Sequence, residues 1–279
     1  MRAALVQITS SDDPAETLPR TRAAIDAAVS EGAGFVLTPE VTNCVSSSRS
    51  LQREVLSFED DDPTLAALRD AAARHGIWLL IGSLGLKLAD ESRFANRSFM
   101  IGPAGEIAAR YDKIHMFDVD ISETETYRES DGYRPGDSAT VVETGFAKVG
   151  MAVCYDLRFP YLFRALAHAG AEILTLPAAF TTVSGAAHWH TLLRARAIET
   201  GCWVLAPGQT GTHSVRRGPP RASYGHSLAV APWGEIVLDM GTAPGVGVID
   251  LDMAQVAEAR RRIPAIRHDR PFKNPSPAQ

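Results

Sequence analysis

Three side chains whose chemistry is complementary lie far apart in this sequence. Cys154 follows a short apolar run and precedes a polar turn that leads to Pro160, Glu40 follows an apolar run, and Lys113 follows another. A cysteine thiolate is a strong nucleophile, a carboxylate can take the thiol proton, and an ammonium group can stabilise negative charge. Together they could cleave a carbonyl–nitrogen bond, provided that the fold brings them together.

Each of the three residues lies just past a predicted strand. Ligands of open α/β folds bind outside the carboxyl ends of strands, so one crevice could collect all three groups. The first part of the chain alternates between predicted strands and predicted helices. Apolar runs predict strands, and helical periodicity with Asp62 as a cap, Pro63 at the first position and Gly76 at the end predicts a helix. The expected elements are strand 3–8, helix 15–30, strand 35–38, helix 63–75 and strand 77–81.

The rest of the chain mixes hairpins with further strand–helix pairs, which predicts an α/β layered fold with mixed sheets. Residues 112–137 are polar and show little periodicity, so we expect a long excursion without regular structure there. The remaining expected elements are hairpins 98–101/107–111 and 227–231/235–239, strands 147–153, 172–176, 202–206 and 246–250, helices 161–169 and 188–200, and a short helix through Arg262.

The composition is that of an ordinary globular protein. The 279 residues are 45% hydrophobic and 22% charged, and no linker or abrupt shift in composition divides them, so one domain is favoured. A net charge of −5 argues against a nucleic-acid partner. No stretch approaches the ~20 apolar residues of a membrane span, and three widely spaced cysteines suit a reducing compartment, so we expect a cytoplasmic protein with at least one free thiol.

Three segments resemble the signatures of the nitrilase, or carbon-nitrogen hydrolase, superfamily: residues 38–40, 111–118 and 150–160. The similarity continues through residues 176–180, 187–189, 193–199, 224–227 and 231–234. It implies a four-layer α-β-β-α sandwich over residues 1–251, a C-terminal extension at 252–279 that packs on the surface or in an oligomer, and a homodimer or larger assembly. It also implies hydrolysis of a nonpeptide C–N bond through a thioester.

The same resemblance suggests a role for individual residues. Glu40 matches the general base of the family, Lys113 its catalytic lysine, Cys154 its nucleophile and Glu129 a second glutamate that many members have. Charge develops on the carbonyl oxygen during attack, and we expect Lys113 and the backbone N–H of Tyr155 to stabilise it.

Within the superfamily, residues 192–199, 224–227 and 262–271 look most like the branch of deaminated glutathione amidases and omega-amidases. That branch implies a small amide that carries a carboxylate, so an arginine should face the pocket. Arg158, four residues after the nucleophile, is the candidate by proximity, although a structural ion pair would explain it equally well. Relatives commonly have glutamate where His190 stands.

Other functions remain open at this point. A nitrilase would use the same four groups on a nitrile, a noncatalytic member would keep the sandwich as a scaffold, and a Cys-His hydrolase would use His115 or His226 as its base. We expect no metal, because His188 and His190 lie two apart and do not share a helix face. We expect no nucleotide cofactor, because residues 82–85 lack the dinucleotide and phosphate-loop patterns.

Overall fold

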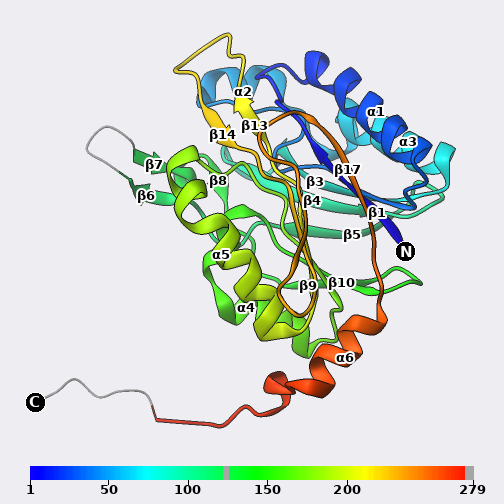
Figure 1. The fold of residues 1–279 in the computed structure, drawn as a ribbon. Helices are drawn as coiled ribbons and strands as arrows, with labels where there is room; N and C mark the ends of the chain where they lie inside the picture. The colour runs from blue at the N-terminus through cyan, green and yellow to red at the C-terminus, as the bar shows by residue number, and fades with distance from the viewer. Residues whose placement is uncertain (122–125, 274–279) are drawn as a thin grey trace, which may run out of the picture.

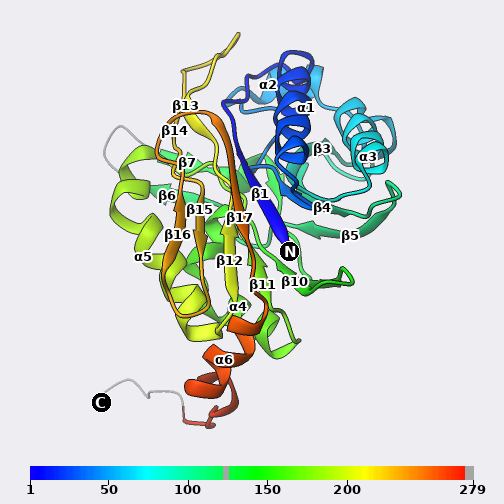
Figure 2. The same ribbon diagram turned by 45° about the vertical axis from the view of Figure 1, so that its right-hand side comes forward.

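Two β-sheets pack face to face, with helices on both outer sides. The computed structural model describes residues 1–121 and 126–273. Within them, one sheet has the strand order β17-β1-β2-β3-β4-β5, with β8 paired to β4, and the other has the order β16-β15-β12-β11-β10-β9. Figures 1 and 2 show α1 and α3 outside the first sheet, and α4 and α5 outside the second. The predicted four-layer α-β-β-α sandwich is confirmed.

The strands of the first sheet are buried on both faces, because one face packs against the second sheet and the other against helices. Leu5 and Leu37 point into the core between the two sheets, whereas Val6 and Val36 point the other way and pack with the residues of α1 and α3. Its elements are β1 (Arg2–Gln7), α1 (Pro14–Ser30), β2 (Phe35–Leu37), α3 (Pro63–His75), β3 (Trp78–Lys87), β4 (Phe94–Ile101), β5 (Ile107–Asp112), β8 (Tyr133–Arg134) and β17 (Gly245–Asp250).

The second sheet has a parallel centre and antiparallel edges. The parallel strands are connected through α4 and α5, whose residues Phe163 and Leu193 pack into the same core as the strands. Its elements are β9 (Thr140–Glu143), β10 (Lys148–Met151), α4 (Pro160–His168), β11 (Ile173–Thr175), α5 (Thr182–Thr200), β12 (Trp203–Ala206), β15 (Leu228–Val230) and β16 (Ile236–Asp239). The carboxyl ends of β2 and β10 therefore open toward the same crevice.

Several predicted helix ends are confirmed. Asp62 accepts a hydrogen bond from the backbone of Leu65 at 2.8 Å, and Gly76 ends α3 with φ +64°. Gly201 ends α5 with φ +62°. The predicted start of α5 at residue 188 was wrong, because the Thr181 side chain caps the helix and it begins at Thr182.

The expected excursion over residues 112–137 contains short regular elements. Strands β6 (Asp118–Asp120) and β7 (Thr126–Arg128) form a hairpin, and a 3₁₀ turn (Glu129–Asp131) and β8 follow. Each is too short for a periodic signal, and residues 122–125 lie outside the described residues. The prediction also missed α2 (Arg49–Val55), β13 (Thr210–Thr212), β14 (Ala222–Tyr224) and the 3₁₀ turns Glu59–Asp61 and Cys154–Arg158.

The C-terminal segment begins as a packed helix. Val256 and Ala259 of α6 (Ala254–Arg262) are buried, and Arg260 donates hydrogen bonds to the carbonyls of Ala171 and Thr200. A 3₁₀ turn (Ala265–Arg267) follows, and Figure 1 shows the chain then leaving the sandwich. The domain boundary at residue 251, the self-association and the cytoplasmic location stay predictions, and residues 274–279 lie outside the described residues.

None of the described helices is both long and apolar enough to cross a membrane. The predicted free thiol is confirmed, since Cys44, Cys154 and Cys202 are all unbridged and buried.

Candidate active site

A cavity of about 620 Å³ collects the residues that the sequence singled out. Glu40, Lys113, Glu129 and Cys154 all line it. Glu40 comes three residues after β2, Lys113 directly after β5 and Cys154 three residues after β10. The two sheets thus contribute different parts of one site.

Lys113 lies between two carboxylates. Its ammonium group donates to Glu40 Oε1 at 2.9 Å and to Glu129 Oε1 and Oε2 at 2.9 and 2.8 Å. Only 2% of the Lys113 side chain is exposed, against 6% for Glu40 and 15% for Glu129. Backbone N–H groups complete the shell, since Ala179 donates to Glu40 Oε2 and Phe117 donates to Glu129 Oε2. Such well-bonded buried charges are rigidly oriented.

The turn that carries Glu40 is packed against β3, the strand that pairs with β2 in the sheet. A methyl group on Gly82 of β3 would lie 2.0 Å from the Thr38 carbonyl oxygen and 2.6 Å from Pro177 Cβ. Val41, the residue after Glu40, has φ +45°, which is a strained conformation for a β-branched residue. Its N–H donates to Ser83 Oγ at 2.8 Å. Close packing and side-chain hydrogen bonds together fix the direction of the carboxylate.

The turn that carries Cys154 is fixed by Asp156. Cys154 has φ +49°, and strained residues of this kind cluster at functional sites. The Asp156 carboxylate accepts hydrogen bonds from the Val153 N–H at 2.8 Å and from the Tyr111 hydroxyl at 2.7 Å. It also accepts the His115 N–H at 3.1 Å. Since Tyr111 and His115 flank Lys113, this one buried carboxylate ties the lysine segment to the cysteine turn.

The electrostatics of the site place the proton on sulfur in the free protein. Burial and the charge of Glu40 raise the pKa of the Cys154 thiol well above its usual value, and Lys113 opposes them only in part. Burial would raise the pKa of Glu40, but the charge of Lys113 and hydrogen bonds from Lys113 and the Cys154 thiol lower it. The pKa directions thus favour a neutral thiol and an ionised carboxylate in the same cavity, rather than the preformed thiolate that a lone cysteine–lysine pair would give.

Asn96 joins the two carboxylates and was missed by the sequence analysis. Its side-chain NH₂ donates to Glu40 Oε1 at 2.9 Å and to Glu129 Oε1 at 3.3 Å, and its backbone carbonyl accepts the Lys113 backbone N–H at 3.0 Å. The residue lies within β4, where burial hides any polar pattern. Asp156 was missed too, although it lies inside the cysteine signature.

Of the two expected site residues that follow the cysteine, Tyr155 and Arg158, only one lines the cavity. Tyr155 lines the cavity, but Arg158 is not among the described residues that do so. The Arg158 guanidinium lies 3.2 Å from His188 Nδ1 and over the ring of Phe180 at 5.6 Å. Arg221, in the segment before β14, does line the cavity.

The two histidines weighed as alternative bases are engaged elsewhere. His115 Nδ1 lies 2.6 Å from Asp156 Oδ1, its Nε2 contacts the Tyr161 hydroxyl, and its ring stacks on Phe159. His226 Nδ1 lies 2.9 Å from Asp239 Oδ1. Neither is among the described residues that line the cavity, so the geometry disfavours a Cys-His hydrolase.

The metal prediction considered the wrong pair of histidines. His188 and His190 diverge as expected, but His190 meets His226 and Asp239, which come from distant parts of the sequence. Among the described residues these three form a group that could hold a metal ion. They are not among the described residues that line the cavity.

Comparison with known proteins agrees with the fold. The family model for carbon-nitrogen hydrolases matches residues 2–261. Proteins named deaminated glutathione amidase are similar over nearly the whole chain. The one from Yersinia enterocolitica is 39% identical over 96% of this chain and 92% of its own, and the one from Homo sapiens is 36% identical over 96% and 82%.

Solved structures agree as well. The C. elegans NitFhit protein superposes with a TM-score of 0.89 at 33% identity, covering 96% of this chain and 65% of that one. Saccharomyces cerevisiae Nit3, a member of the nitrilase superfamily, gives 0.83 at 28% identity over 95% and 94%. The chain therefore belongs to the carbon-nitrogen hydrolase family and is a hydrolase of C–N bonds other than peptide bonds.

Proposed function

We propose that this protein is a cysteine-dependent amidase that cleaves small carboxylate-bearing amides of the deaminated glutathione type through a thioester on Cys154. The observation that carries the proposal is that one cavity brings Cys154 together with Glu40 and Lys113, and that Lys113 donates a hydrogen bond to Glu40 at 2.9 Å. The names of the relatives support the substrate class. A structure of a related Nesterenkonia amidase, in which acrylamide has added to the active-site cysteine, supports the role of the thiol.

The resting protonation state assigns general-base chemistry to Glu40. As Cys154 Sγ bonds to the amide carbon, the thiol proton moves to Glu40. Because the pKa of the thiol is raised, the thiol loses its proton only during this attack. This timing keeps an exposed thiolate from forming between turnovers. It also protects the cysteine from oxidation, which proceeds through the thiolate.

The oxyanion is stabilised by Lys113 and by the backbone N–H of Tyr155, which follows the nucleophile. Preorganised donors of this kind are worth about 3 kcal/mol each. Lys113 is already held by three carboxylate contacts, so it needs no reorganisation when charge develops on the carbonyl oxygen. Glu129 orients Lys113 rather than transferring a proton.

Breakdown uses the same carboxylate twice. Protonated Glu40 gives its proton to the departing nitrogen, the C–N bond breaks, and ammonia or an amine leaves. Glu40, again ionised, then takes a proton from water as the hydroxyl bonds to the thioester carbon. The C–S bond breaks to release the acid, and Glu40 returns that proton to sulfur, which restores the thiol and the ionised carboxylate.

Arg221 is the best candidate to bind the substrate carboxylate. Its guanidinium donates to the Ala179 carbonyl and lies 5.7 Å from the centre of the Tyr127 ring. Its Nε is buried and has no hydrogen-bond partner among the described residues. An unused guanidinium donor on the wall of a cavity suits a carboxylate, which can accept two parallel N–H bonds. Arg221 therefore replaces Arg158 in this role.

The test compares three proteins on matched substrates. Wild type, Cys154→Ala and Cys44→Ala are assayed for ammonia or amine release from deaminated glutathione, 2-oxoglutaramate, neutral amides and the nitrile that corresponds to one of the amides. Cys44 is the control because it also lines the cavity, and burial raises the pKa of its thiol to about 12. We expect the wild type and Cys44→Ala to cleave the anionic amides and Cys154→Ala to be inactive.

Mass spectrometry of the quenched wild-type protein should show the acyl group on Cys154. Turnover of the nitrile in place of the amides would make the protein a nitrilase. An inert wild type whose Cys154 also fails to react with an electrophile would make it a noncatalytic scaffold.

A further inference from the structure

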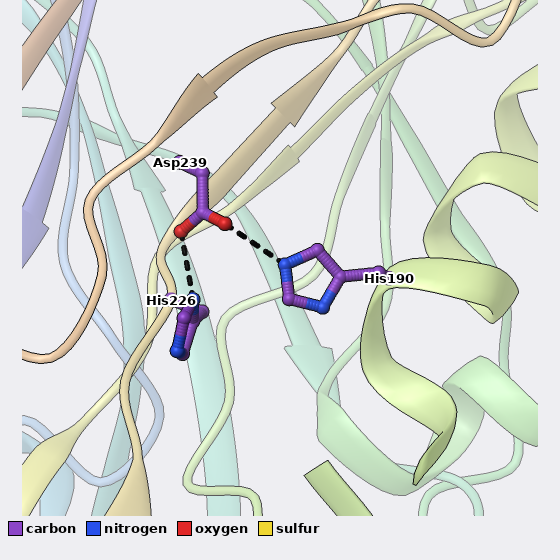
Figure 3. Close-up of side chains that lie close together, drawn as sticks. All are labelled: His190, His226 and Asp239. Atoms are coloured by element: carbon purple, nitrogen blue, oxygen red, sulfur yellow. Dashed lines mark hydrogen bonds and ion pairs between the residues drawn. The ribbon is translucent and has the colours of Figure 1, made fainter. Parts of the chain in front are cut away.

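His190, His226 and Asp239 converge from three separate elements, away from the cavity. His190 lies on α5, His226 between β14 and β15, and Asp239 at the end of β16. Figure 3 shows the Asp239 carboxylate between the two imidazole rings. Its Oδ2 lies 2.9 Å from His190 Nε2, and its Oδ1 lies 2.9 Å from His226 Nδ1. One ligand atom of each residue lies within 4.8 Å of the other two.

From this cluster we infer that the protein binds a divalent transition metal, with zinc as the best match, through His190, His226 and Asp239. Two imidazole nitrogens and one carboxylate oxygen are a usual zinc ligand set, and a water completes a tetrahedron. Ligand atoms around a tetrahedral zinc lie about 3.4 Å apart, given metal–ligand distances near 2.1 Å. The two 2.9 Å contacts, which use different oxygens of the Asp239 carboxylate, therefore have to widen by about 0.5 Å, and ligand atoms that lie farther apart, within the 4.8 Å limit, have to close to about 3.4 Å.

Hydrogen bonds and ring stacking fix the backbone and the imidazole of His226. His226 has φ +53°, and its N–H donates to the Gly241 carbonyl at 2.6 Å. Its carbonyl accepts the Trp189 indole N–H at 2.8 Å, and its ring stacks on Tyr224 at 4.5 Å between centroids. Non-glycine residues in this conformation persist only when the surroundings enforce them. Here the result is an imidazole aimed at Asp239.

Asp239 is prepared to act as a ligand. Its Oδ1 also accepts the Gly241 N–H at 2.9 Å, which orients the carboxylate as partners in the second coordination shell do in metal sites. Burial opposes ionisation, but hydrogen bonds from His190, Gly241 and His226 lower the pKa of Asp239.

A small ion can reach the cluster from solvent. The side chains of His190, His226 and Asp239 are 30%, 24% and 33% exposed. On binding, the imidazole nitrogen that faces the cluster gives up its proton, either to the other nitrogen of the ring or to solvent, and its lone pair bonds to the metal.

The metal would fasten α5 to the second sheet. Thr182 and Ser184, at the start of α5, line the cavity, as does Ala222, two residues before Tyr224. Tyr224 contacts both imidazole rings. The inferred metal is therefore structural, holding one wall of the active site, and takes no part in bond cleavage. The inference does not depend on the substrate proposed above.

Zinc affinity tests the inference in a protein that lacks the reactive thiol. Cys154→Ala protein, freed of metal by chelation, is titrated with Zn²⁺ by calorimetry. The absorption spectrum of bound Co²⁺ reports the coordination geometry. We expect the bands of a four-coordinate site, without the thiolate-to-cobalt charge-transfer bands that cysteine ligands give. We expect about one zinc per chain and a higher Tm with zinc.

Three further variants in this background locate the site. His190→Gln can still donate a hydrogen bond to Asp239, so it should fold, but it lacks the imidazole lone pair. Asp239→Asn removes the charge, and His188→Ala is the matched control on the same helix. We expect His190→Gln and Asp239→Asn to weaken zinc binding at least tenfold. Mutation of a residue that only hydrogen-bonds to a metal ligand already costs about that much affinity. His188→Ala should bind as its parent does.

Two results would overturn the inference: no stoichiometric zinc in the Cys154→Ala protein, or unchanged affinity in His190→Gln. In either case the cluster would be a hydrogen-bonded His–Asp–His contact between α5 and the sheet.

Discussion

At the scale of single residues, the arrangement of charges around Lys113 decides how the site works. Two carboxylates face one ammonium group, so the centre carries a net negative charge before any thiolate forms. A second negative charge on sulfur is therefore unfavourable until substrate arrives. Burial and the charge of Glu40 raise the pKa of Cys154, whereas Lys113 lowers the pKa of Glu40 in spite of its burial, so the two values move in opposite directions.

Glu129→Gln should leave the fold intact and slow formation of the acyl-enzyme. Glu129 Oε1 and Oε2 accept from Lys113 while Oε2 also accepts the Phe117 N–H, and an amide NH₂ cannot accept from either donor. We expect single-turnover acylation to fall by about 10²-fold, within the range for such preorganised groups, with little change in Tm. Asp131→Asn, an exposed acid in the same 3₁₀ turn, is the control. Near-wild-type acylation in Glu129→Gln would remove it from the mechanism.

Arg221→Gln should discriminate between anionic and neutral amides. A hydrogen bond to a charged group is worth about 1.5–3 kcal/mol, so we expect kcat/KM for the carboxylate-bearing amide to fall about 10- to 100-fold. A neutral amide should be cleaved as before. Arg158→Gln, which alters a guanidinium outside the cavity, should affect neither substrate. Equal losses on both substrates would mean that Arg221 only supports the cavity wall.

At the scale of elements, strand ends explain which site residues could be predicted. Glu40, Lys113 and Cys154 each follow an apolar strand, and that pattern is visible in the sequence. Glu129 came only from the family resemblance, since its 3₁₀ turn has no periodic signal. Arg221 and Asn96 could not be found, because one lies in a loop distant from every signature and the other inside a buried strand. Arg158 is near the cysteine in sequence but is not among the described residues that line the cavity, because proximity in sequence does not fix where a side chain points.

Helix and strand boundaries followed a similar rule. Asp62, Gly76 and Gly201 are local signals, and the ends that they predict are confirmed. The start of α5 was missed because the cap at Thr181 lies beyond the apolar periodicity of the helix. Strands of three residues, such as β6 and β7, carry too few positions for alternation to be recognised.

Gly82→Ala should damage activity more than its size suggests. The added methyl would lie 2.0 and 2.4 Å from the carbonyl oxygens of Thr38 and Pro39, and backbone cannot yield cheaply. We expect a loss of about 1–3 kcal/mol in the free energy of unfolding. We also expect a fall in kcat of more than about tenfold, since a misplacement of 1 Å can cost about 100-fold. Gly245→Ala, in β17 where nothing is closer than 4.0 Å, is the control. Unchanged kcat would show that the Glu40 turn relaxes freely.

At the scale of the whole molecule, buried polar contacts tie the strand ends of the two sheets together. His213 is 1% exposed and bridges the Ser10 carbonyl at 2.7 Å and the Ser223 hydroxyl at 2.8 Å. Gln209 makes a second link, with its side-chain amide donating to the Ser10 hydroxyl and to the Glu40 carbonyl. Folding of this region and positioning of the base are therefore coupled.

The stability of the protein should fall between pH 6.5 and pH 4 because of His213. Burial lowers the pKa of His213 to about 4, so the unfolded chain binds a proton in this range while the folded protein does not. Stability from the neutral ring is complete above pH 6.5 and is lost as the pH falls, by roughly 3 kcal/mol in all.

Thermal unfolding between pH 4 and pH 7 measures this effect. His213→Gln can keep both hydrogen bonds without titrating, so its Tm should depend less on pH than that of the wild type. The exposed His268 provides the control variant, His268→Gln. Parallel Tm curves for the wild type and His213→Gln would assign the acid sensitivity to other groups.

The position of β1 has a consequence for synthesis of the chain on the ribosome. β1 is the first strand made, yet it is paired on one side with β17, from Arg2 opposite Asp250 to Gln7 opposite Gly245. Until the last strand emerges, β1 presents an open edge of backbone donors and acceptors. At 5–20 residues per second, that edge stays unpaired for roughly 10 to 50 s. The nascent protein must therefore be guarded against edge-to-edge association over this time, and the sandwich closes only once β17 has been made.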